Sequence, residues 1–131
     1  MASTWQEQQE RREMTAHDDR PINEDWERRP SDVARKLAAG DDFVLIDCRR
    51  PDELEIASLP WNEHVPLQEL SSQLEKLAPY EDDEVIVYCH HGVRSLNFVA
   101  ILREAGFENA WSMAGGIDRW SQQIDDSIPT Y

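Results

Sequence analysis

The chain has 131 residues, 40% of them hydrophobic, which suffices for one modest core but not for two ordinary domains. Its net charge of −14 disfavours nucleic acid and anionic membrane surfaces as partners, because both would repel it. No apolar stretch approaches the roughly 20 residues that cross a bilayer, and the first residues lack the pattern of a secretory signal. The expectation is a soluble, cytoplasmic, single-domain protein.

Residues 1–29 are expected to form a charged N-terminal arm, mobile or loosely docked. Its large apolar residues are Trp5 and Trp26. Ser3 and Gln6 could form a capping box for a short helix, but no continuous apolar stripe follows them, which favours a frayed, solvated arm. Residues 31–131 hold 19 acidic and 8 basic side chains, so −11 of the net charge lies in the predicted domain, residues 30–131. A short tail is expected from about residue 124.

Within this domain, strand patterns alternate with helix patterns. Ser31 is the expected N-cap of a helix that Gly40 ends. Residues 43–47 and 84–89 are apolar runs without polar alternation, typical of strands covered on both faces. The other expected elements are a turn with a short helix at 49–59, short strands at 64–67 and 109–113, and helices at 67–77, 95–106 and 115–124. This alternation predicts an α/β fold with a mostly parallel central sheet and helices on both faces.

Two cysteines close the two strongest strands, Cys48 after the first and Cys89 after the second. Two are too few for a disulfide framework, so both are expected to be free thiols. Ligands of parallel α/β sheets bind beyond the carboxyl ends of the strands, which is where both cysteines fall.

The sequence "CHHGVRS", which begins at Cys89, joins the second strand to a helix. Its backbone N–H groups can converge into an anion cradle, and the anion could be a ligand or the Cys89 thiolate itself. A thiol in such a loop should have a lowered pKa. The alternative is that Cys89 is only a small buried hydrophobic residue. The residues expected to form the cradle are His90, His91, Gly92, Val93, Arg94 and Ser95.

The loop resembles the active-site loop of the rhodanese family of sulfurtransferases, with its Cys-x-x-Gly-x-Arg-Ser pattern. "LIDCRRPDEL" is similar to the family's Asp-Val-Arg…Glu stretch, matching at Asp47, Arg49 and Glu53, and "AGFENAWSMAGGIDRW" resembles its closing segment. The resemblance covers roughly residues 31–123. It implies the rhodanese-like fold, agreeing with the α/β pattern.

The resemblance also implies a two-step sulfur transfer. Cys89 would take the outer sulfur of a donor such as thiosulfate as a persulfide, and cyanide or a thiol would then remove it. Arg94 would orient the loop or the anionic donor. The expected partners are a small sulfur donor, a thiol acceptor and a sulfur-relay protein, with no cofactor.

Three acidic and basic residues, Asp47, Arg49 and Glu53, are expected to brace the loop as a buried ion-pair network and not to take part in the chemistry. His90 and His91 would lie at the loop tip, where they could steer anionic donors or simply be solvated. A metal site of Cys89 with both histidines is disfavoured, because adjacent residues rarely point at one ion.

Two departures from the family pattern stand out. "ASLPWNEHVPL" replaces the usual Gly-His-Ile and Pro-Gly-Ala, so the wall from Ala57 to Trp61 is expected to differ in shape. Cys48 stands where valine is more usual. It is interpreted mainly as a tolerated buried side chain, and alternatively as a resolving thiol that attacks a persulfide on Cys89.

Two other functions are compatible with this scaffold. Cysteine phosphatases use a Cys-x5-Arg loop, and arsenate reductases need a comparable pocket with a resolving thiol; the Cys-x4-Arg loop here makes a smaller cradle, which suits sulfur better than a tetrahedral oxyanion. A non-catalytic binding module is the other alternative. Such modules typically lack the cysteine, which this chain retains at Cys89.

Overall fold

The computed structural model describes residues 21–131, so the predicted cap at Ser3 and Gln6, and Trp5, lie outside the described part of the chain. Among the described residues, no helix is both long enough and apolar enough to span a membrane. The elements follow in the order β1 (Glu27–Arg28), α2 (Pro30–Ala39), β2 (Val44–Asp47), α3 (Pro51–Ile56), β3 (Glu63–His64), η1 (Leu67–Glu69), α4 (Leu70–Leu77), η2 (Ala78–Tyr80), β4 (Val85–Tyr88), α5 (Val93–Glu104), β5 (Ala110–Met113) and α6 (Gly116–Gln123).

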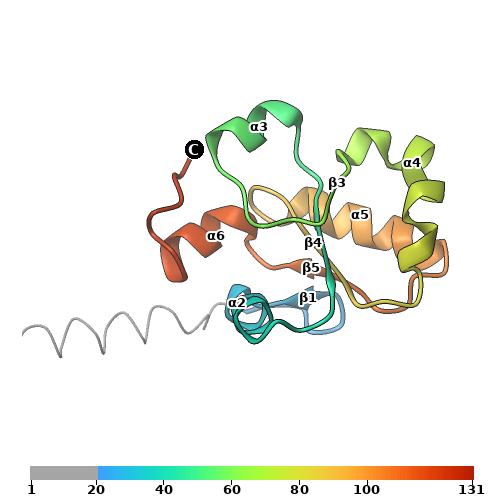
Figure 1. Cartoon of the computed structure of the whole chain (residues 1–131), viewed down its shortest axis with the longest axis horizontal. Helices are drawn as coiled ribbons and strands as arrows, with labels where there is room; N and C mark the ends of the chain where they lie inside the picture. Colours follow the sequence, from blue (N-terminus) through green and yellow to red (C-terminus); the bar gives the residue numbers. More distant parts are fainter. Residues whose placement is uncertain (1–20) are drawn as a thin grey trace, which may run out of the picture.

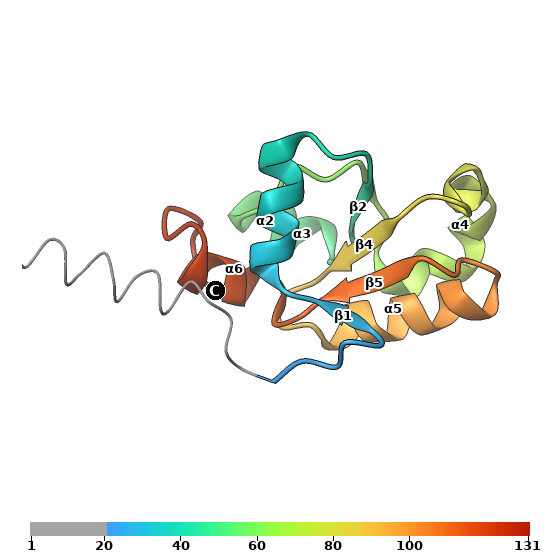
Figure 2. The ribbon, with the colours of Figure 1, turned by 90° about the horizontal axis from the view of Figure 1, so that it is seen from below.

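The five strands form one sheet in the order β1-β5-β4-β2-β3, and every neighbouring pair is parallel. Helices α4 and α5 lie on one side of this sheet, and α2 and α6 lie on the other (Figures 1 and 2). The predicted α/β fold with helices on both faces is therefore confirmed. β2 and β4 lie inside the sheet, where both faces are covered, and all eight of their residues are buried.

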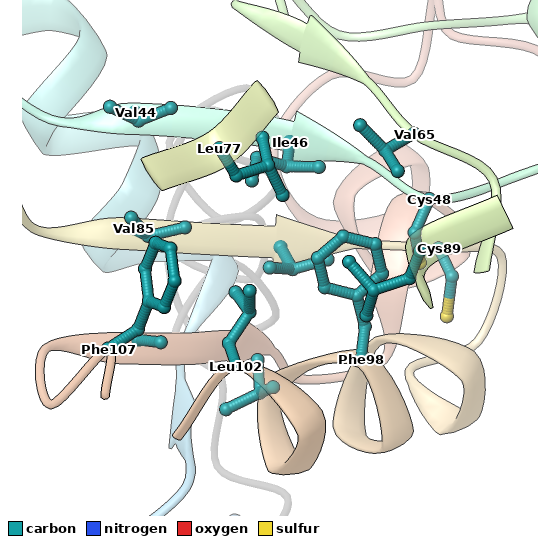
Figure 3. Close-up of a cluster of buried hydrophobic side chains, with 14 residues drawn as sticks. Val44, Ile46, Cys48, Val65, Leu77, Val85, Cys89, Phe98, Leu102 and Phe107 are labelled. Carbon is teal, nitrogen blue, oxygen red and sulfur yellow. The ribbon is translucent and has the colours of Figure 1, made fainter. Parts of the chain in front are cut away.

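The apolar side chains of β2 and β4 divide between two cores because successive residues of a strand point to opposite faces. Val44, Ile46, Val85 and Val87 pack with Phe98 of α5 in one core (Figure 3). The opposite core takes the alternate strand residues and apolar side chains from α2 and α6; its central members are Leu45, Ile86, Tyr88, Val33, Ile117 and Trp120. The uninterrupted apolar runs in the sequence reflect this double burial.

Edge strand β1 lies within the stretch that the sequence assigned to the charged arm. It is only two residues long, and both are partly exposed, so it has no apolar period to reveal it. The backbone of Trp26 accepts a 2.9 Å hydrogen bond from Ser112, and Arg28 accepts one of the same length from Ala114. The end of the arm thereby completes the sheet.

Two predicted helix starts are wrong. The first helix begins at Pro30 with Arg29 as N-cap, because proline suits the first helical position and displaces the cap from Ser31. The helix after the loop begins at Val93 and not at Ser95, because Gly92 already takes the cap position. The strand expected at 64–67 is also displaced, since β3 covers Glu63–His64.

Candidate active site

Cys89 lies at the carboxyl edge of the sheet, directly after β4 and just before α5. Gly92 is the N-cap of α5 and has a φ of 100°, a left-handed conformation that glycine adopts without steric cost. This conformation turns the chain back on itself within three residues. As a result, the N-terminal end of a 12-residue helix faces the Cys89 sulfur.

The Cys89 sulfur is surrounded by hydrogen-bond donors. The backbone N–H of Gly92 donates to Sγ at 3.0 Å and that of Ser95 at 3.4 Å, while the Ser95 hydroxyl lies 3.3 Å away. The hydroxyl of Ser112 on β5 lies 2.7 Å from that of Ser95 and fixes its position. Of the six residues predicted to form the cradle, Gly92 and Ser95 contact this sulfur, so the donors converge on the cysteine itself.

A further influence on this sulfur comes from Cys48, which follows β2 as Cys89 follows the neighbouring strand β4. The hydrogen bond from the Cys48 thiol is the strongest influence lowering the pKa of Cys89, which falls to about 5 against the opposing effect of burial. The hydrogen bonds from Ser95 and Gly92 lower it further. The same contact with Cys89, together with burial, raises the pKa of Cys48 well above its usual range. The pair therefore holds one thiolate and one thiol at neutral pH.

The other side of the loop rests on the start of α6. The N–H groups of Ile117 and Asp118 donate to the carbonyl oxygens of Cys89 and His90 at 2.9 and 3.0 Å. These short contacts require Gly116, because a Cβ there would overlap both carbonyl oxygens. The loop carbonyls are thus satisfied by α6, which leaves the loop N–H groups free to face the sulfur.

Arg94 pairs with Glu53 on α3. Its Nη1 and Nη2 atoms lie 2.6 and 2.9 Å from the two carboxylate oxygens, a two-pronged arrangement. Burial alone would raise the pKa of Glu53, but the hydrogen bonds from Arg94 and Tyr131 outweigh it and lower that pKa to about 2. Of the two roles expected for Arg94, this contact favours orienting the loop.

Asp47 and Arg49 form a separate, fully buried ion pair, with Arg49 Nη2 2.8 Å from Asp47 Oδ2. Arg49 also donates to the carbonyl oxygen of Ala57 at 2.6 Å, and the hydroxyl of Tyr88 accepts a 3.0 Å bond from Leu59. These bonds position the wall after α3 whose sequence departs from the family pattern. Of the three residues predicted to form one network, Asp47 and Arg49 pair with each other, whereas Glu53 pairs with Arg94 and, at 3.8 Å, with Arg50.

The remaining loop residues lie on its outer side. His91 and Val93 are exposed, whereas His90 is partly buried and stacks on Tyr131, with ring centroids 3.8 Å apart. Burial and the neighbouring His91 lower the pKa of His90, which makes its neutral form prevail at neutral pH. His90, His91 and Asp118 could bring three ligand atoms within 4.8 Å of one another, and Cys89 takes no part in that cluster.

Tyr131 is the site residue that sequence reasoning missed. Its hydroxyl donates to Glu53 at 2.6 Å and accepts from Arg49 at 2.7 Å, so it joins the two ion pairs. Figure 1 shows the end of the chain beside α3. The terminal segment "DDSIPTY" contains no motif. Only folding brings Tyr131 to Glu53 and Arg49, which lie 78 and 82 positions earlier in the sequence.

The candidate site is thus a buried cysteine between a parallel strand and a helix N-terminus, with two backbone N–H groups donating to its sulfur. The model of the rhodanese-like domain family matches residues 29–123, and the chain belongs to that family. The resemblance seen in the sequence is confirmed.

Sequence similarity to two curated proteins supports this family membership. The chain is 39% identical over 95 residues to rhodanese-like/PpiC domain-containing protein 12, chloroplastic, of Arabidopsis thaliana, covering 70% of this chain and 31% of the relative. It is 34% identical over 103 residues to adenylyltransferase and sulfurtransferase MOCS3-2 of Zea mays, covering 74% and 21%. The chain thus spans between a fifth and a third of these relatives.

Among solved structures, a rhodanese-related protein from Thermoplasma volcanium superposes with a TM-score of 0.66 at 28% identity. The match covers 79% of this chain and 95% of that one, so the same fold occurs there as almost the whole chain.

Proposed function

We propose that this chain is a sulfurtransferase that carries a sulfane sulfur on Cys89 as a persulfide. The observation that carries the proposal is the Cys89 sulfur itself, which accepts hydrogen bonds from Gly92 and Ser95 and has a pKa lowered to about 5. A thiolate at neutral pH is the nucleophile that attack on a sulfur–sulfur bond requires. The sulfurtransferase name of the Zea mays relative supports the same reaction class.

In the first step, the Cys89 thiolate attacks the outer sulfur of a donor such as thiosulfate. A bond forms between the two sulfurs, and the sulfur–sulfur bond of thiosulfate breaks with sulfite leaving. In the second step, cyanide or a thiol attacks the outer sulfur of the persulfide and Cys89 leaves as a thiolate. The Cys89 sulfur is a thiolate before the first step and again after the second. The N–H groups of Gly92 and Ser95 stabilise it in both states.

The surroundings of Cys89 favour a small donor. The residue is only 1% exposed, so bulky donors have no direct route to its sulfur. Arg94 and Glu53 hold α5 against α3 and keep the loop's N–H groups aimed inward. The proposed donors are therefore thiosulfate or the terminal sulfur of a low-molecular-weight persulfide. A sulfur-relay protein could serve only by presenting its persulfide on an extended segment.

The proposal needs no metal or organic cofactor, because each step is a nucleophilic displacement at a sulfur atom. Free thiols at Cys48 and Cys89 suit a reducing compartment, and the cytoplasm is the compartment proposed here. Neither nucleic acid nor a membrane surface enters the reaction.

Steady-state kinetics with thiosulfate and cyanide test the proposal. Thiocyanate formation should follow a ping-pong pattern, with parallel reciprocal plots, and should fall to the background rate in Cys89→Ser. An inactive chain that still binds thiosulfate would instead support a binding module. Hydrolysis of an aryl phosphate without any sulfur transfer would support a phosphatase.

A further inference from the structure

Cys48 and Cys89 leave neighbouring strands at the same level. β2 and β4 pair in parallel from Val44 with Val85 to Asp47 with Tyr88, so the next pair in register is Cys48 with Cys89. The N–H of Cys48 still donates to the carbonyl oxygen of Tyr88 at 3.1 Å, which shows that the ladder continues to this level. Neighbouring strands lie about 4.8 Å apart, within the range of roughly 4.4–6.8 Å that separates the Cα atoms of disulfide-bonded cysteines.

Both side chains point to the same face of the sheet. Cys48 lies two residues after Ile46, and Cys89 lies two residues after Val87. Each cysteine therefore points into the same core beneath α5 as that strand residue (Figure 3). Each cysteine is 1% exposed. Both thiols lie in the same core, and the residue beside Cys48 on the neighbouring strand there is Cys89.

We propose that Cys48 is a resolving thiol that attacks the inner sulfur of a Cys89 persulfide, forms a Cys48–Cys89 disulfide and expels the outer sulfur as hydrogen sulfide. This inference rests on the proposed persulfide function. The bond from Cys48 to Cys89 forms while the persulfide bond breaks. The Cys48 sulfur is oxidised from thiol to disulfide, the outer sulfur is reduced to sulfide and takes the Cys48 proton, and the Cys89 sulfur keeps the oxidation level that it has in the persulfide, so no outside oxidant is needed.

The electrostatics of the pair make this attack depend on loading. In the resting site the contact with Cys89, burial and the nearby Asp47 all raise the pKa of Cys48, which keeps its thiol protonated and unreactive. Once Cys89 carries the outer sulfur, its own sulfur is no longer a thiolate, so the contact that holds the proton on Cys48 weakens, and that proton can pass to the outer sulfur as it leaves. A thiol acceptor competes by taking the outer sulfur first. Cys48 thus clears a sulfur that finds no acceptor, and a dithiol reductant reopens the site.

Release of sulfide without an acceptor tests the inference. Full-length wild type, Cys48→Ser and Cys48→Val are reduced, loaded with thiosulfate, freed of excess donor and followed by sulfide assay and intact mass. The wild type should gain one sulfur, release one equivalent of sulfide and finish two hydrogens lighter than the reduced chain, with a peptide linking Cys48 to Cys89. In both variants sulfide release should be at least about tenfold slower, since the neighbouring thiol is gone.

Cys48→Ser is the matched control, because its hydroxyl can still donate to Cys89 while it cannot form a disulfide. Equal sulfide release by wild type and Cys48→Ser would overturn the inference and leave the sulfurtransferase proposal standing, as would a stable persulfide in the wild type. If neither thiosulfate nor inorganic polysulfide loads any variant, the proposed function fails, and the sulfide-releasing role of Cys48 fails with it.

Hydrogen peroxide tests the reach of Cys48 without any sulfur loading. Peroxide converts the Cys89 thiolate to a sulfenic acid, which Cys48 should condense with to give the same disulfide and water. The linked peptide should appear in the wild type at a rate independent of protein concentration. A Cys89 sulfenic acid that persists beside a free Cys48 would show that the two sulfurs cannot meet, and would overturn the inference on geometry alone.

Discussion

The hydroxyl of Tyr131 donates a 2.6 Å hydrogen bond to Glu53, 78 residues earlier in the chain. Because the same hydroxyl accepts from Arg49, it connects the buried Asp47–Arg49 pair with the Glu53 carboxylate that holds Arg94. Burial and the bond to Glu53 raise the pKa of Tyr131 to about 12, so the hydroxyl keeps its proton across the physiological range. The C-terminal segment is thereby part of the scaffold beneath the cysteine loop.

Tyr131→Phe should lower the free energy of unfolding by about 1–3 kcal/mol, because hydrogen bonds to two charged partners are lost while the stack on His90 remains. Urea unfolding measures the change. Tyr80→Phe is the control, since that hydroxyl bonds a single carboxylate, Glu63, near the surface. Equal effects of the two substitutions would contradict the bridging role of Tyr131.

Gly116→Ala should be far more damaging than Gly40→Ala. The two glycines have similar positive φ values, 61° and 68°, so both substitutions incur a backbone cost of about 1 kcal/mol. A Cβ at Gly40 meets nothing within 4 Å, whereas one at Gly116 overlaps the carbonyl oxygens of Cys89 and His90. We expect at least about 3 kcal/mol of destabilisation at Gly116, with slower alkylation of Cys89 in the folded fraction. Similar unfolding midpoints would show that α6 does not hold the loop.

The rate of Cys89 alkylation by iodoacetamide should titrate near pH 5 in the native protein, as against about pH 8.5 for an unperturbed cysteine. Between about pH 5 and pH 8.5, Cys89 is deprotonated in the folded chain and protonated in the unfolded chain. Its contribution to the free energy of unfolding therefore grows as pH rises across this window and is lost as pH falls toward 5. Alkylation of the urea-unfolded chain is the reference. A native profile that coincides with it would contradict an anionic Cys89.

Cys48→Val and Cys48→Ser separate the hydrogen bond of Cys48 from its thiol chemistry. Valine removes the donor that most lowers the pKa of Cys89, so the alkylation midpoint should rise, by about 1 pH unit or more. Serine keeps a donor and should shift the midpoint less. Alkylation profiles of the two variants, each with its unfolded reference, make the comparison. A larger shift in Cys48→Ser would refute the hydrogen bond as the cause.

Much of the fold follows from local sequence patterns. The runs that became β2 and β4 are apolar without alternation because both faces of a central strand are buried, and the loop after β4 is recognisable because its glycine, arginine and serine have fixed spacing from Cys89. These signals lie within a few residues of one another. The sequence therefore predicts the family and the position of the thiolate.

Features that depend on contacts between distant segments could not be predicted in this way. β1 has only two residues and exists because it pairs with β5, and Tyr131 reaches the site only after α6 has packed. Arg94 could equally have faced a donor, and its pairing with Glu53 is decided by how α3 and α5 meet. The sequence left Cys48 open between packing and chemistry because only strand register brings it beside Cys89.

The most direct test of the central claim is the intact mass of the protein after incubation with thiosulfate, followed by addition of cyanide. The persulfide mechanism predicts that wild type gains one sulfur atom, that Cys89→Ser gains none, and that cyanide added at once removes the sulfur as thiocyanate. Loading of Cys89→Ser, or a wild type that gains no sulfur from thiosulfate or polysulfide although its alkylation shows an ionised Cys89, would contradict it.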